Sequence, residues 1–293
     1  MPIMTSLTSW NVEPPLLLVL VCAFLYARGG HRQASARRAG LERRGRAWLF
    51  YCGLAAVVIA LDSPLDSLSG QLFAAHMAQH VLLLSVAPPL IVLSAPWSRL
   101  WQPLPLDFRR TVARAVVLGP RWRPLRAAAR AVSHPLAAWV LFNVNLVVWH
   151  VPALYNATLH SLAVHDLEHA LFFVTGLLFW ARVFDTAPFH ARLDWLRRVA
   201  YVTGGLAVGW ILSIVLALAP SPLYSVYVSL AHRPGGLSAL GDQQIAAGVM
   251  WVPGSIAYTL AIIIFFYRWL DPEPSGRPAV RPARLGVAGT TDP

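Results

Sequence analysis

Seven long apolar runs, separated by polar loops, constrain this chain more than any other feature. They lie near residues 12–28, 46–62, 72–95, 135–151, 165–185, 199–219 and 245–269. A bilayer's hydrocarbon core is about 30 Å thick, and a helix needs roughly 20 apolar residues to cross it. Backbone groups in lipid must be hydrogen-bonded within their own segment, so runs of this length are expected to be helices. The sequence predicts an all-α integral membrane protein, with a seven-transmembrane-helix bundle over residues 1–270.

Composition agrees with this interpretation and excludes other classes of protein. Hydrophobic residues make up 57% of the 293 residues and charged residues only 13%, whereas about a quarter of the residues in an ordinary soluble domain are charged. A disordered chain, a coiled coil and most cytosolic enzymes are therefore excluded. Residues 271–293 are rich in Pro, Gly and Arg and are predicted to form a disordered cytoplasmic tail. The first ten residues carry no basic side chain, so a cleaved signal peptide is not expected.

The arginines predict the orientation of the bundle. All 24 basic residues are arginine: seven from Arg28 to Arg46, eight from Arg99 to Arg130, four from Arg182 to Arg198, four from Arg268 onward, and Arg233. Basic residues collect in cytoplasmic loops, so the N-terminus is predicted outside and the C-terminus in the cytoplasm. The net charge of +11 then reflects topology and contact with membrane lipid, and nucleic acid is not an expected partner. Residues 104–130 are predicted to form an amphipathic surface helix.

Histidines gather at the predicted external ends of the spans. Seven of the ten lie there: His76, His80, His150, His160, His165, His169 and His232. Residues four apart share one face of a helix, so His76 with His80, and His165 with His169, each form a two-nitrogen edge. Two such edges on neighbouring helices could enclose one metal ion, and imidazole suits copper, zinc, iron and nickel. We therefore predict a metal site of His76, His80, His165 and His169, with His150 as a further ligand.

Other polar and sulfur-bearing residues could assist such a site. The auxiliary candidates are Met77, Glu168, Asp166, Asp62, Asp242 and Met250. Cys22 and Cys52 are the only cysteines and form no CxxC pair, so a tight thiolate site for Cu(I) is not expected. Pro88 and Pro89 lie within the third span and are predicted to kink it below His80, which frees carbonyl groups that need partners.

Three blocks of this sequence carry a family resemblance. They are HMAQHVLLLSVAPPLIVLSAP, then WHVPALYNATLH followed by HDLEHALFFVTGLLFW, and DQQIAAGVMWVPG. Together they resemble the multi-span CtaG family of cytochrome c oxidase assembly factors, and the likeness covers roughly residues 45–270. The single-span, cysteine-bearing copper chaperone that shares the name is a different protein.

The resemblance implies a function and a location. It implies a multi-pass protein of the bacterial plasma (inner) membrane that helps to load copper into haem-copper oxidase and is not itself an enzyme. The implied partners are cytochrome c oxidase subunits or a periplasmic copper chaperone. The family's histidine blocks fall on His76, His80, His150, His165 and His169, and its last block includes Asp242.

Residues 165–169 also permit a membrane-embedded zinc hydrolase. They read HDLEH and fit the H-x-x-E-H pattern of inverted zinc proteases, in which the glutamate is the general base. Glu168 would then activate a zinc-bound water. Five residues match such a pattern by chance often enough that the motif alone is weak.

Two further alternatives remain open at the level of the sequence. His80 and His169 could ligate a haem in a membrane electron carrier, although pairs of histidines on one helix are redundant for a single haem. A scaffold that binds oxidase subunits without any metal would also satisfy the family blocks. A visible absorption spectrum and a metal analysis of the purified protein distinguish these alternatives from a copper site.

Overall fold

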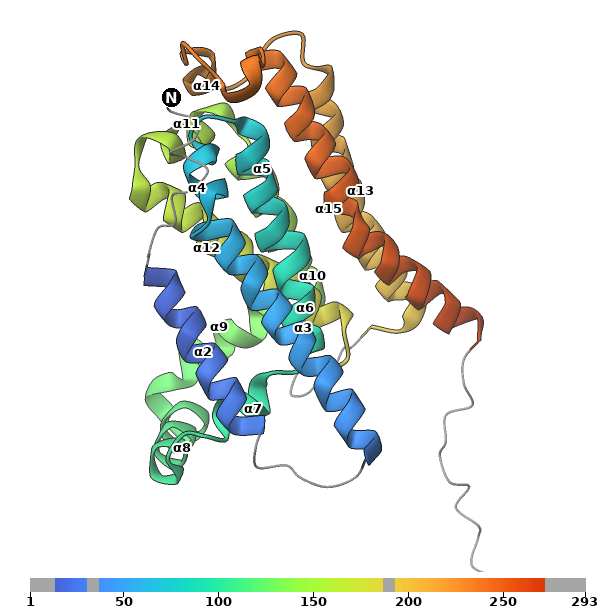
Figure 1. The fold of residues 1–293 in the computed structure, drawn as a ribbon. Coiled ribbons are helices and arrows are strands. Elements are labelled where there is room, and N and C mark those ends of the chain that lie inside the picture. Colours follow the sequence, from blue (N-terminus) through green and yellow to red (C-terminus); the bar gives the residue numbers. More distant parts are fainter. Residues whose placement is uncertain (1–13, 31–36, 187–192, 272–293) are drawn as a thin grey trace, which may run out of the picture.

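Each predicted span coincides with a helix. The computed structural model describes residues 14–30, 37–186 and 193–271. The long helices are α2 (Pro14–Gly30), α3 (Arg37–Leu61), α5 (Phe73–Val81) with η1 (Leu82–Val86) and α6 (Ala87–Leu93), α10 (Pro135–Trp149), α12 (Leu162–Val183), α13 (Trp195–Leu218) and α15 (Ala239–Leu270) (Figure 1). Beyond Asp271, the predicted tail lies outside the described residues.

Length and hydropathy single out five of these helices as able to cross a membrane. They are Glu42–Leu61, Phe73–Leu93, Leu162–Val183, Trp195–Leu218 and Ala239–Leu270. The other two are shorter: α2 has 17 residues and α10 has 15. A bend of 77° separates α10 from the helical segment before it. The chain is thus an all-helical membrane protein, while the count of seven spans and the orientation stay predictions.

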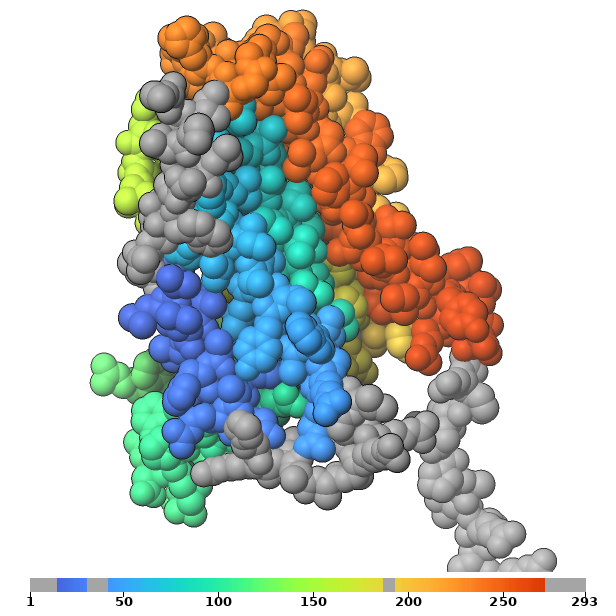
Figure 2. Space-filling view, viewed as in Figure 1, coloured from blue at the N-terminus to red at the C-terminus, as the bar shows by residue number. Residues whose placement is uncertain are grey.

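The third apolar run forms the centre of the bundle. In Phe73–Leu93, 67% of the residues in the most apolar window are buried, against 17% to 33% in the other four spanning helices. It contacts α3, α12 and α15, and α13 and α15 pair along its flank (Figure 1). Helix α15 presents its outer side to the surroundings, and its C-terminal end projects beyond the bundle (Figure 2). Most side chains on the central helix are therefore buried within the protein.

Where the sequence predicted a kink, this helix has a π-helical turn, η1, directly before Pro88. Proline has no N–H, so the carbonyl of Leu84, four residues before Pro88, loses its helical donor. Trp180 of α12 supplies a replacement, since its Nε1–H donates to the Leu84 oxygen at 3.1 Å. Gly176 lets α12 come this close, because a Cβ there would lie 2.9 Å from the Pro88 ring. The freed carbonyl thus joins the helix that carries His76 and His80 to the helix that carries His165 and His169.

Short helices cap the two ends of the bundle differently. At one end lie α4 (Pro64–Ser69), α11 (Pro152–His160), α14 (Ser225–Val228) and η4 (Pro234–Gly236). At the other lie α7 (Trp97–Trp101), α8 (Leu106–Ala113), η2 (Arg114–Leu118), η3 (Pro120–Trp122) and α9 (Arg123–Val132) (Figure 1). The arginine-rich segments lie at this second end.

The prediction of one amphipathic helix over residues 104–130 was wrong in its continuity. The backbone is extended at Gly119 (ψ 130°), and Pro120 follows at the start of the next helical turn. Because proline interrupts the hydrogen-bond ladder, the segment divides into α8 with η2 and a separate α9. Arg126 closes the break by donating to the carbonyl oxygens of Val116 and Gly119, both at 2.8 Å.

Candidate metal centre

Four side chains from two helices converge inside the bundle. They are His76 and His80 of α5 and Glu168 and His169 of α12, whose potential ligand atoms all lie within 4.8 Å of one another. Their exposed fractions are 0%, 3%, 0% and 4%. The spacing of four residues places His76 and His80 on one face of α5, and that face meets the face of α12 that carries Glu168 and His169. We call these four residues the histidine–glutamate centre.

Glu168 lies between the two imidazoles of α5. Its Oε2 is 3.3 Å from His76 Nε2, and its Oε1 is 3.5 Å from His80 Nε2. The ring of His169 is 5.6 Å from that of His76 and 5.5 Å from that of His80. One carboxylate and three imidazoles therefore surround a common point, as the ligands of a single ion would.

The centre is rich in unsatisfied polar atoms. Among the described residues, no hydrogen-bond partner is present for His76 Nε2, for either ring nitrogen of His80, for His169 Nε2 or for either Glu168 oxygen. A buried polar group without a hydrogen bond destabilises the fold, and a buried charge does so far more. Native proteins keep few such groups. A cluster of them on facing side chains makes this a candidate site for a cation.

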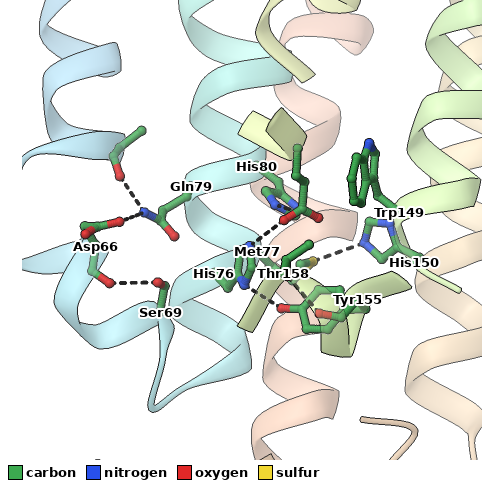
Figure 3. Close-up of polar contacts among 12 residues, drawn as sticks. Asp66, Ser69, His76, Met77, Gln79, His80, Trp149, His150, Tyr155 and Thr158 are labelled. Carbon is green, nitrogen blue, oxygen red and sulfur yellow. Dashed lines mark hydrogen bonds and ion pairs between the residues drawn. The ribbon is translucent and has the colours of Figure 1, made fainter. Parts of the chain in front are cut away.

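A chain of hydroxyl groups leads to Nδ1 of His76. Tyr227 donates its hydroxyl proton to the Ser69 carbonyl at 2.7 Å, so its oxygen is free to accept from Tyr155 at 3.2 Å. Tyr155 Oη lies 2.7 Å from His76 Nδ1 and can then accept a proton from that nitrogen (Figure 3). Burial raises the pKa of Tyr155 well above 10, so this hydroxyl stays protonated. In this arrangement Nδ1 carries the ring proton of His76, and Nε2, which lies 3.3 Å from Glu168, has the lone pair.

His150 lies beside the centre and faces a sulfur atom. Its Nδ1 lies 2.7 Å from the Leu146 carbonyl oxygen, and its Nε2 lies 3.3 Å from Met77 Sδ (Figure 3). The His150 ring is 6.0 Å from that of His80. The structure thus brings His150 and Met77 together one side chain away from the four-residue set.

Comparison with known proteins places the chain in a family. The model of the cytochrome c oxidase caa3 assembly factor family (Caa3_CtaG) matches residues 24–271. The chain belongs to this family. Most of the described fold, including all four residues of the centre, lies within the matched range.

Curated relatives of this Caa3_CtaG member are described only as uncharacterized proteins. One from Mycobacterium bovis is 24% identical over 239 residues, which cover 79% of this chain and 36% of the relative. One from Mycobacterium leprae is 23% identical over 242 residues, covering 81% and 35%. The chain thus spans about a third of the length of these relatives. No solved structure matches it significantly.

His165, a predicted ligand, and Asp166, a predicted auxiliary residue, lie at the margin of the centre. The ring of His165 is 4.1 Å from that of His169 and 5.2 Å from that of His76, but His165 is not one of the four converging residues. Asp166 is exposed. Both line an apolar cleft of about 650 Å³ between α2, α3 and α12, which also reaches His169. The H-x-x-E-H string therefore supplies Glu168 and His169 to the centre and directs His165 towards the cleft.

Asp242, predicted as an auxiliary ligand, occupies a structural position instead. Its carboxylate accepts the backbone N–H groups of Phe73 at 2.7 Å and Ala74 at 3.0 Å. Leu72, which precedes α5, offers no side-chain cap. A carboxylate satisfies the free N–H groups of a helix start and favours the positive end of the helix dipole. Asp242 thus anchors α15 to the helix that carries His76 and His80.

The remaining auxiliary candidates lie outside the four-residue set. Asp62 is buried at the end of α3, and Met250 lines a small cavity beside His80 and His150. Sequence reasoning missed Tyr155 and Tyr227 altogether. The signal for Tyr155 was its place inside the block that follows His150, whereas nothing in the sequence pairs Tyr227 with His76.

Proposed function

We propose that this Caa3_CtaG member binds a copper ion at the histidine–glutamate centre and supports its insertion into cytochrome c oxidase. The observation that carries the proposal is Glu168, a fully buried acid held between two imidazoles with both oxygens lacking a hydrogen bond. Membership of an oxidase assembly family supports copper as the ion, because cytochrome c oxidase must receive copper during assembly. In this proposal copper is cargo, and the protein itself catalyses no reaction.

The donor set suits copper or another imidazole-binding metal. Three neutral imidazoles and one carboxylate carry a net charge of −1, which a cation neutralises within the protein. Metal–nitrogen and metal–oxygen distances of about 2.0–2.2 Å place the ligand atoms of one tetrahedral ion roughly 3.3–3.6 Å apart. The separations of 3.3 and 3.5 Å between Glu168 and the two imidazoles lie in that range. The hydroxyl chain from Ser69 to His76 resembles the outer hydrogen bonds that orient metal-bound histidines elsewhere.

We further propose that the centre faces the periplasm of a bacterial plasma membrane. The centre lies at the opposite end of the bundle from the arginine-rich helices, and basic residues favour the cytoplasmic side.

Cysteine labelling tests this placement in a Cys22→Ser/Cys52→Ser background. His160→Cys should react with a membrane-impermeant thiol reagent in intact cells, whereas Arg121→Cys should react only after lysis. The reverse pattern would contradict the proposed orientation.

Metal analysis tests the copper site directly. Detergent-purified protein should bind one equivalent of copper tightly at the centre, and His76→Ala/His80→Ala/His169→Ala should lose it. His160→Ala/His232→Ala is the matched control, since both histidines are exposed and lie at the same end of the bundle. In cells, the first variant should lower the copper content and activity of the oxidase and the control should not. An unchanged oxidase with the first variant would refute the assembly role.

A zinc hydrolase remains the second candidate because Glu168 lies against the imidazoles. His76, His80 and His169 could hold zinc, and Glu168 could then deprotonate a bound water. This alternative requires purified protein that carries zinc and cleaves a lipid or peptide, with activity abolished by Glu168→Gln. In the copper proposal, the same substitution weakens metal binding and no hydrolysis is found.

The haem and scaffold alternatives receive less support from the geometry. A haem ligated by His80 and His169 needs these rings on opposite faces of a flat macrocycle. Instead, the ligand atoms of both rings lie within 4.8 Å of each other and of those of His76 and Glu168. The ring of Phe172, 4.3 Å from that of His80, occupies space beside it that a macrocycle would need. A metal-free scaffold does not explain why ring nitrogens of His76, His80 and His169 are buried without a hydrogen bond. Absence of a haem absorption band and presence of bound copper would exclude both.

A further inference from the structure

The contact between His150 and Met77 is unusual for two buried side chains. His150 Nδ1 lies 2.7 Å from a carbonyl oxygen that can only accept, so this nitrogen carries the ring proton. The neutral ring then has a bare lone pair at Nε2, and this atom lies 3.3 Å from Met77 Sδ, which also only accepts. The exposed fractions of the two residues are 5% and 0%. Two lone pairs thus face each other away from water.

A soft cation would turn this repulsion into attraction. Bonds of about 2.0 Å to nitrogen and about 2.3 Å to sulfur place the two ligand atoms roughly 3.3–3.5 Å apart around one ion. The observed 3.3 Å agrees with that spacing. Thioether sulfur is a soft ligand that selects Cu(I), while imidazole binds several metals. The pair therefore matches Cu(I) better than zinc.

A small cavity lies beside His150 and is also lined by His80 of the histidine–glutamate centre. It measures about 50 Å³, and His80, His150 and Met250 all contribute to its wall. His80 belongs to the centre, so one side chain borders both places. Met250 enters from α15 and offers a second thioether to the same space. The volume admits an ion or one to a few waters, by the measure of about 10–15 Å³ for each water.

We propose that His150 Nε2 and Met77 Sδ, with Met250 from the cavity wall, form a second, softer site that holds Cu(I) next to the first. The inference deepens the proposed copper-handling function and rests on it. The two sites differ in chemistry: the centre offers nitrogen and carboxylate oxygen, and the second site offers nitrogen and sulfur. A Cu(I) ion can exchange between them past His80 without a change in oxidation state.

Separate titrations with Cu(I) and Zn(II) test this inference on purified protein. Wild type should bind two equivalents of Cu(I), under a reductant, and one of Zn(II). Met77→Leu/Met250→Leu, which nearly conserves volume, should weaken the second Cu(I) equivalent at least tenfold and leave Zn(II) binding unchanged. Glu168→Gln should weaken Zn(II) binding and retain the second Cu(I) equivalent. His150→Gln should also weaken the second Cu(I) equivalent, and His160→Gln, at an exposed histidine, is its control.

X-ray absorption at the copper edge gives a readout independent of affinity. Wild type loaded with two equivalents of Cu(I) should show a sulfur scatterer at about 2.3 Å, and Met77→Leu/Met250→Leu should show only nitrogen and oxygen. Sulfur signal retained in that variant, or Cu(I) binding equal to wild type, would overturn the second site alone. If neither Glu168→Gln nor Met77→Leu/Met250→Leu changes copper binding, both the second site and the proposed copper-binding function are refuted.

Discussion

The two ends of this bundle accommodate charge in opposite ways. At the arginine-rich end, short helices expose their basic side chains, and the Arg110–Asp107 pair at 3.9 Å is 61% and 97% exposed. At the histidine end, Glu168 is fully buried, and its carboxylate oxygens lie 3.3 and 3.5 Å from the imidazoles of His76 and His80. Water and lipid headgroups solvate the exposed charges of the arginine-rich end. Only protein atoms or a bound ion can compensate the buried negative charge of Glu168.

This difference teaches where substitutions should matter. Exposed ion pairs contribute about 0–1 kcal/mol because solvent screens them. A buried, convergent set has fixed geometry, and removing one member leaves the others uncompensated. We therefore expect large, specific effects at the histidine end and small, interchangeable ones at the arginine end. Four substitutions test that contrast.

The largest expected effect belongs to Glu168. Glu168→Gln keeps the size of the side chain but removes the charge that offsets a bound cation. We expect copper affinity to fall more than about 100-fold, since even residues that only support metal ligands cost 10–100-fold. Asp166→Asn is the matched control, because it changes an exposed acid two residues away on the same helix. Competition titration with a copper chelator measures both, and equal affinities would refute a metal role for Glu168.

Tyr155→Phe should have the next largest effect. It removes the hydroxyl that lies 2.7 Å from His76 Nδ1, so the imidazole loses the nearest hydrogen bond that orients its ring. We expect a loss of about 10–100-fold in copper affinity with the fold retained. Tyr267→Phe, at an exposed tyrosine of α15, is the control. If the stability of Tyr155→Phe falls while its copper affinity is unchanged, the hydroxyl has a structural role only.

The sequence predicted the helices and much of the centre for identifiable reasons. Apolar runs of bilayer length predicted the helices, and pairs spaced by four predicted that His76 joins His80. Helical spacing also explains why Glu168 and Asp166 differ: residues 165, 168 and 169 share one face of α12, whereas Asp166 lies round the helix. Helical spacing alone therefore places Glu168 on the same face of α12 as His165 and His169.

Other parts of the centre could not be read from local patterns. The Asp242 carboxylate meets the start of α5 across 169 positions of sequence, and Tyr227 reaches His76 across 151. Such contacts depend on how α15 and the short capping helices pack. Gly119 and Pro120 lie at the break in the surface helix, and the prediction of one continuous helix over residues 104–130 did not take account of them.

Asp242→Asn should affect stability more than metal binding. The amide still accepts one hydrogen bond but loses the charge that favours the start of α5. We expect about 0.5–2 kcal/mol of destabilisation, the range for a lost helix cap, and a change in copper affinity of less than threefold. Thermal unfolding in detergent, alongside the chelator titration, separates the two quantities. A loss of copper as large as that of Glu168→Gln would make Asp242 a ligand after all.

Arg110→Gln should have the smallest effect and completes the comparison. Its ion pair with Asp107 spans three residues on α8, and both side chains are largely exposed. Surface substitutions of this kind change stability by less than about 0.5 kcal/mol, and copper affinity should equal that of wild type. Unfolding measured at low and high salt provides the check, since any contribution from this pair must diminish as salt screens it. A larger, salt-insensitive loss would mean that α8 packs against the bundle or a partner, and that the arginine end is as specifically built as the histidine end.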